Sequence, residues 1–212
     1  NPKLDSLNGM EGIVEIGETY RFSQYIDNNA VLASIDGLSG VRGVLPGALR
    51  VTRNPALVTF DGLEGVTGVA GYSSSAGYSI YIWANDALRS VVALDNVQGD
   101  LPGGLVVCNN SALESPQGLH GIRAAGTEAA WDGEAVYILA NPALCATPDE
   151  VSALRTMCET SVGYGVGDVV DCAPASDAEW WDSTRCEGKR TAGFALRAAT
   201  THAGALARSN SL

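Results

Sequence analysis

The sequence predicts a mainly β protein: a right-handed parallel β-solenoid of about six coils with a disulfide-rich C-terminal cap. Three observations support this prediction: a repeat anchored on asparagine, a two-residue apolar alternation before the asparagine, and an apolar interval of three after it. A strand alternates every second residue and an amphipathic helix every third and fourth, so an interval of three suits neither. Stacked repeats that share one core explain the pattern better.

The repeat occurs six times, with spacings of 28, 25, 31, 25 and 31 residues between successive anchors. The anchors are Asn1, Asn29, Asn54, Asn85, Asn110 and Asn141. Three positions after each anchor stands a leucine: Leu4, Leu32, Leu57, Leu88, Leu113 and Leu144. An Asn amide both donates and accepts hydrogen bonds, so the anchors are expected to form an Asn ladder along one corner of the stack.

The alternation before the anchors predicts a short strand in each repeat, with one face inward. The inward pairs are Leu49 and Val51, Ile80 and Ile82, Leu105 and Val107, and Val136 and Ile138, with Gln24 and Ile26 as a weaker version. After the anchors, tight 3₁₀-like turns or short extended segments would place an aliphatic residue at every third position. The sixth copy loses this pattern after Leu144, and we therefore expect it to be the last coil. The insertions "AGYSSSAGYS" and "AAGTEAAWDG" are expected to bulge on one side of the stack.

The segments "LRVTRNPALVTFDGLEGV" and "VYILANPALC" resemble the receptor L-domain family, whose leucine-rich-repeat-like β-solenoids occur in growth-factor receptors and fungal cell-wall proteins. The resemblance covers residues 1 to about 160. It implies ligand recognition, adhesion or wall architecture and supplies no catalytic residue. Pro46 and Pro102 lie close to the strand, which departs from the plant-type leucine-rich repeat.

Five cysteines favour an extracellular, secreted or cell-surface setting. Four of them are candidates for disulfides in the cap, with Cys145–Cys158 and Cys172–Cys186 as first guesses. Zinc is the weaker alternative, because the short C-x₂₋₄-C pair of structural zinc sites is missing. Cys108 is left as a free thiol, a partner of Cys145 or a link to another chain. Asn109 opens a sequon with Asn110 and Ser111 and is a candidate glycosylation site.

Charge and motifs argue against several functions. The net charge of -11 disfavours nucleic acid, and no apolar run approaches the roughly 20 residues that span a bilayer, so no membrane insertion is expected. His120 and His202 are the only histidines, too few for most triads or metal centres. No phosphate-binding Gly-rich loop or calcium-loop spacing occurs. The recurring carboxylates Asp36, Asp61 and Asp95 leave a carbohydrate-active β-helix enzyme as a distant alternative.

Aromatic residues gather where the strands should face outward, at the positions four and two residues before the anchors. This outward face, the predicted binding surface, contains Tyr25, Arg50, Tyr81, Trp83 and Tyr137, together with Asp27, Thr52, Val106, Cys108 and Leu139. Exposed aromatic rows favour contacts with sugar rings or another protein. The alternative is that aromatics simply suit strands or that the C-terminal tail covers them.

These patterns divide the chain into solenoid repeats at 1–153, a Cys-rich cap at 154–187 and a basic, Ala-rich tail at 188–212. The chain begins within a coil, which suggests either a fragment or an end covered by another subunit. We predict a non-enzymatic structural or adhesive protein without cofactor or metal, whose partners are other subunits or copies of itself. A receptor-like ectodomain that binds a glycan or protein ligand is the alternative.

Overall fold

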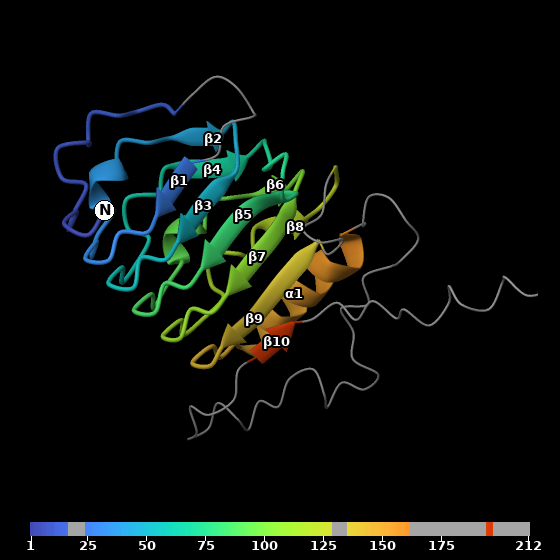
Figure 1. Cartoon of the computed structure of the whole chain (residues 1–212). Helices are drawn as coiled ribbons and strands as arrows, with labels where there is room; N and C mark the ends of the chain where they lie inside the picture. Colours follow the sequence, from blue (N-terminus) through green and yellow to red (C-terminus); the bar gives the residue numbers. More distant parts are fainter. Residues whose placement is uncertain (17–23, 129–134, 162–193, 197–212) are drawn as a thin grey trace, which may run out of the picture.

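A computed structural model describes residues 1–16, 24–128, 135–161 and 194–196. Its main sheet contains five parallel strands in sequence order: β1 (Gln24–Asp27), β3 (Leu49–Thr52), β5 (Tyr78–Trp83), β7 (Gly104–Cys108) and β9 (Val136–Asn141). β10 (Phe194–Leu196) joins β9 in the antiparallel direction and completes the sheet (Figure 1). Equivalent positions of the repeats pair in register, as Arg50 does with Tyr81, so each position of the repeat forms a row across the sheet.

Two smaller sheets lie beside the main sheet, each formed by two parallel strands. β2 (Gly43–Leu45) pairs with β4 (Val66–Val69), and β6 (Gly99–Asp100) pairs with β8 (Ile122–Ala124). Two 3₁₀-helices, η1 (Asp36–Leu38) and η2 (Val92–Leu94), precede β2 and β6. Elements of the second and third repeats recur 56 residues later in the fourth and fifth, starting at 36 and 92, 43 and 99, and 66 and 122. The structural unit is therefore a pair of repeats.

The predicted right-handed parallel β-solenoid of about six coils is wrong, because the described sheets are small and split into separate groups. Most of the predicted disulfide-rich cap lies outside the described residues. A regular β-solenoid continues each of its sheets through every coil, whereas here the smaller sheets are separate two-stranded pieces. Among the described residues, β4 pairs with β2 but not with β6, a strand of only two residues. The backbone there is linked instead by isolated hydrogen bonds, such as the one from Gln98 N to Thr67 O (3.1 Å). The five parallel strands alone are only loosely compatible with the predicted architecture.

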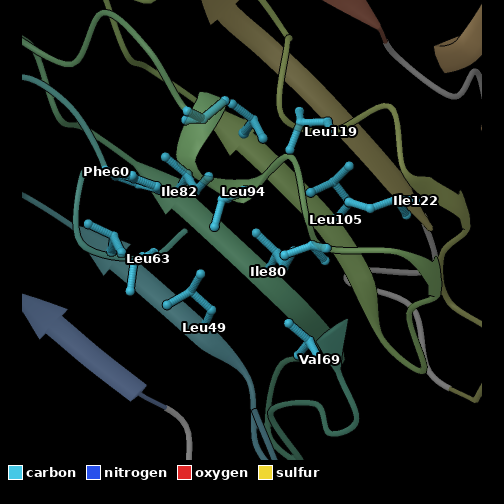
Figure 2. Close-up of a cluster of buried hydrophobic side chains, with 14 of the residues drawn as sticks. Leu49, Phe60, Leu63, Val69, Ile80, Ile82, Leu94, Leu105, Leu119 and Ile122 are labelled. Carbon is cyan, nitrogen blue, oxygen red and sulfur yellow. The ribbon is translucent and has the colours of Figure 1, made fainter. Parts of the chain in front are cut away.

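The apolar interval of three follows from consecutive tight turns. In the third repeat, the N–H groups of Leu57, Leu63 and Val66 each donate to the carbonyl three residues earlier. Each turn returns an apolar side chain to the same side, where it meets the inward residues of the main sheet. Figure 2 shows this core, in which Phe60, Leu63 and Leu94 lie among Leu49, Ile80 and Ile82.

The C-terminal end of the core is covered by the helix α1 (Pro148–Thr160), which the sequence analysis did not predict. Thr147 Oγ1 accepts from the N–H of Glu150 (3.3 Å), and a Glu150 carboxylate oxygen accepts from the N–H of Thr147 (2.6 Å). This is a capping box, with proline at the first helical position. Leu154 and Met157 enter the core. The predicted boundary between repeats and cap, at residues 153 and 154, lies inside α1.

The insertion at residues 70–79 contains a turn, in which the N–H groups of Ala76 and Gly77 donate to Ser73 O, and ends within β5. Ala76 packs against side chains on the outer side of the main sheet, so this insertion folds toward the strands. The second insertion includes residues 129–134, which lie outside the described residues.

Candidate functional site

The outward face lies on the side of the main sheet opposite the core. Tyr25, Arg50, Tyr81 and Tyr137 occupy one row, because β1, β3, β5, β7 and β9 pair in register. Tyr25 is the most exposed of them, at 57%. Arg50, Tyr81, Trp83 and Tyr137 are half-buried. The structure thus brings the predicted aromatic residues onto one rigid surface.

Arg50 lies between two tyrosine rings of this row. Its guanidinium carbon is 5.3 Å from the ring centroid of Tyr25 and 5.6 Å from that of Tyr81. Both distances are within the range of cation–π attraction. Arg50 Nε also donates to Thr52 Oγ1 (3.3 Å) on the same strand. Three contacts therefore hold the guanidinium close to the sheet.

A polar group flanks this arrangement at the ends of β1 and β3. The Thr52 hydroxyl donates to Asp27, and Arg53 makes two hydrogen bonds to the same carboxylate (3.1 and 2.6 Å). Burial raises the pKa of Asp27, but the hydrogen bonds from Arg53 and Thr52 outweigh it and the net pKa is lowered. Asp27 is thus held as a carboxylate by Arg53.

Tyr78 also belongs to the outward face, and the sequence analysis missed it. Two-residue alternation places residue 78 on the same side as Ile80, inside the protein. A β-bulge changes this parity: Tyr78 pairs with Gly104 and Ile80 with Leu105, so Ser79 is the extra residue. Ser79 Oγ accepts from Gly103 N and donates to Gly71 O, both at 2.7 Å. The three-residue separation of the two tyrosines, 78 and 81, was the only hint in the sequence.

The bulge stacks Tyr78 on Tyr81, with ring centroids 4.7 Å apart and an angle of 32° between the planes. Burial raises the pKa of Tyr78 against the effect of its hydrogen bond with Ser73, and burial also raises that of Tyr81. The strand β5 consequently carries three aromatic rings on its outer side, of which Tyr78 is buried and Tyr81 and Trp83 are half-buried.

Smaller side chains fill the spaces between the rings. An outer cluster contains Ala48, Tyr78, Val106 and Cys108, and Tyr81, Trp83 and Tyr137 pack against it. Val106 is 1% and Cys108 6% exposed. The Cys108 thiol donates to the carbonyl oxygen of Tyr137 at 3.9 Å. The aromatic rings thus pack against these smaller side chains, which leave little open space between them.

The anchors meet at one corner of the sheet in an Asn ladder. In Asn54, Asn85, Asn110 and Asn141, Oδ1 accepts from both the backbone N–H and the Nδ2 of the preceding anchor, at 2.9 to 3.2 Å. Each Nδ2 from Asn54 onward also donates to a strand carbonyl of the preceding repeat, as Asn85 does to Val51 O (2.9 Å). Asn54, Asn85, Asn110 and Asn141 are fully buried. The ladder supports the strands that carry the outward face.

The residue before each anchor has a left-handed backbone, which the sequence analysis did not anticipate. Asn28, Arg53, Ala84, Asn109 and Ala140 have φ between 55° and 58°. Asn tolerates this conformation, whereas alanine and arginine pay a steric cost. No glycine marks the position, so nothing in the residue types signalled it.

The candidate catalytic and metal-binding groups do not form a site among the described residues. Asp36 and Asp61 are exposed, and His120 Nδ1 lies 3.2 Å from Asp95 Oδ1 at a partly exposed position. In the same parts of the chain, no group of three or more metal-binding side chains comes together, and no helix is long and apolar enough to cross a membrane.

The remaining candidate residues lie at the periphery or outside the described structure. Asn109 is exposed at the corner beside the ladder. Cys145 is disulfide-bonded, but the two proposed pairings stay predictions, because the side chains of Cys158, Cys172 and Cys186 are not described. The side chain of Leu139 and the whole of His202 are likewise outside the described residues.

No family model, curated protein or solved structure matches this chain.

Proposed function

We propose that this chain is a non-enzymatic binding protein that takes part in protein–protein assembly at a cell surface, wall or filament. The observation that carries the proposal is the outward face, where tyrosine, tryptophan and arginine side chains share one rigid sheet. These residue types dominate the energetics of protein interfaces, because large rings bury much area at little entropic cost. The aligned strands and the Asn ladder would fix the positions of these side chains before a partner binds.

The extracellular setting is part of the same proposal. The five cysteines of this chain support it, as does the likeness of the Asn-Pro-x-Leu motif to receptor L-domains and leucine-rich repeats. A receptor-like module that binds a glycan is the second candidate. Tyr81 and Trp83 favour it, because they alternate on β5 and could stack on successive sugar rings.

The mass of the native particle tests the first proposal. We would measure it by light scattering and sedimentation over a range of concentrations, for wild type and for Tyr25→Ser and Trp83→Ser. Val58→Ser is the matched control, because Val58 is an exposed apolar residue at 40% that lies away from the outward face. We expect the wild type to form multimers. Both outward-face variants should lower the affinity of self-association at least tenfold, whereas the control variant should leave it unchanged.

A wild-type protein that stays monomeric near 22 kDa at every concentration would refute the assembly proposal. Glycan binding that is lost in Trp83→Ser would then favour the second candidate. Thermal melting of each variant separates a lost contact from a lost fold.

A further inference from the structure

Arg50 has no ion-pair partner in the part of the chain that the structure describes. Its Nε bond to Thr52 is the only side-chain hydrogen bond it makes among the described residues, and it forms no ion pair with any of them. With respect to the described residues, the two Nη groups therefore keep donors to offer, and the side chain is half-buried rather than covered.

Among the described residues, Asp27 attracts Arg50 electrostatically but makes its ion pair with Arg53. Asp27 is the acidic residue of the group, and both of its oxygens accept from Arg53. Thr52 connects the two parts, since its hydroxyl donates to Asp27 and accepts from Arg50. Within the described structure, two arginines thus stand beside one carboxylate, and these three side chains together carry a net positive charge.

The tyrosines prepare Arg50 to bind. Rings at 5.3 and 5.6 Å and the Thr52 bond restrict the guanidinium to one place. A fixed guanidinium loses less conformational entropy on binding, and its planar pair of donors matches the two oxygens of a carboxylate.

We propose that Arg50, clamped by Tyr25 and Tyr81, binds a carboxylate side chain of a second copy of this chain. This inference rests on the proposed assembly function and names the polar contact within it. Charge complementarity selects the occupant: the chain has 24 acidic and 13 basic residues, so a second copy brings a strongly acidic surface to a positive spot. The surrounding rings would exclude water from the pair and strengthen it.

The test compares Arg50→Gln, Arg50→Lys and Arg89→Gln by sedimentation at low and high salt. Arg89 is exposed and lies outside the outward face, so its variant makes the same change of charge elsewhere. We expect Arg50→Gln to weaken self-association at least tenfold and to reduce its salt dependence. Arg50→Lys keeps the charge but loses the planar donors and should also be weakened, whereas Arg89→Gln should behave as wild type.

The outcomes separate this inference from the function on which it rests. If Tyr25→Ser and Trp83→Ser disrupt the multimer but Arg50→Gln does not, the assembly proposal survives and the role of Arg50 is refuted. A wild-type monomer refutes both. Polygalacturonic acid serves as a second probe: if Arg50→Gln abolishes binding to this acidic polysaccharide and leaves self-association unchanged, the second copy is the wrong occupant. Unchanged thermal melting of each variant shows that its fold is intact.

Discussion

The side-chain amide of Asn54 donates to Oδ1 of Asn85 at 3.2 Å, and the backbone N–H of Asn54 donates to the same oxygen at 3.1 Å. Asn85 is fully buried. Loss of its side chain would remove the acceptor of the Asn54 backbone N–H and the Nδ2 that donates to the Val51 carbonyl, whereas Asn54 Nδ2 would keep its hydrogen bonds to Ile26 O and Thr52 O. Each unsatisfied buried group costs about 1–3 kcal/mol, so we expect Asn85→Ala to lower the free energy of unfolding by about 3 kcal/mol or more.

Asn96 provides the matched control in the same repeat. It is exposed, and its Nδ2 makes a single hydrogen bond to Glu64 O at 2.8 Å. Asn96→Ala should cost about 1 kcal/mol or less, because water can replace that contact. Urea unfolding of both variants measures the difference. Equal losses in the two variants would show that the ladder adds no special stability.

Ala84 has a left-handed backbone, with φ of 55°, immediately before Asn85. Glycine adopts this conformation without the steric cost that alanine pays. Although glycine has more freedom in the unfolded chain, we expect Ala84→Gly to stabilise the protein by about 1 kcal/mol. Ala33 is exposed and has no positive φ, so Ala33→Gly should instead destabilise it. Thermal melting checks the sign, and a loss of stability in Ala84→Gly would contradict this account.

Two features of the structure disfavour any side chain at Gly118. Its φ is +103°, and an added Cβ would lie 2.1 Å from the carbonyl oxygen of Val91 in the preceding repeat. Gly9 has a similar φ of +95° but open space around the same position. We expect Gly9→Ala to cost about 1 kcal/mol from backbone strain and Gly118→Ala about 3 kcal/mol or more, because backbone must move. Chemical denaturation measures both, and equal costs would mean that the close approach has no effect.

Sequence periodicity predicts the strands well where one face is buried. Leu105 and Val107 alternate and both lie in the core on β7, because a strand with one apolar face has a single suitable register. Asn85 and Asn110 could be assigned to one row for a related reason, since their side chains satisfy each other only when the repeats are aligned.

Other features depend on local backbone geometry, which residue types specify weakly. The bulge at Ser79 places Tyr78 on the opposite side of the sheet from the one that two-residue alternation predicts, because alternation assumes that no extra residue is inserted. The smaller sheets are separate and β6 has only two residues, although the aliphatic pattern continues through the repeats that form these sheets. The helix α1 could have been found from Thr147 and Glu150, whose spacing is that of a capping box. The regular pattern of the repeats hid this signal.

The pair of Asp27 and Arg53 makes stability depend on pH. Burial raises the pKa of Asp27, yet the hydrogen bonds from Arg53 and Thr52 lower it overall from its ordinary value of 3.8. A carboxyl group whose pKa is lowered by folding contributes stability above its ordinary pKa and loses that contribution as the pH falls through the lowered value. Removing the carboxylate should therefore matter near neutral pH and cease to matter in strong acid.

Asp27→Asn tests this expectation through urea unfolding at a series of pH values from neutral to acid. The difference in free energy of unfolding between wild type and the variant should be largest above pH 3.8 and shrink below it. Arg53→Gln removes the partner, so in that background Asp27→Asn should show a much smaller pH dependence. Because the Arg53 side chain is 47% exposed, salt should weaken the effect in the parent protein. A difference that stays constant across the acid range, or that grows in acid, would show that Arg53 does not stabilise the Asp27 carboxylate.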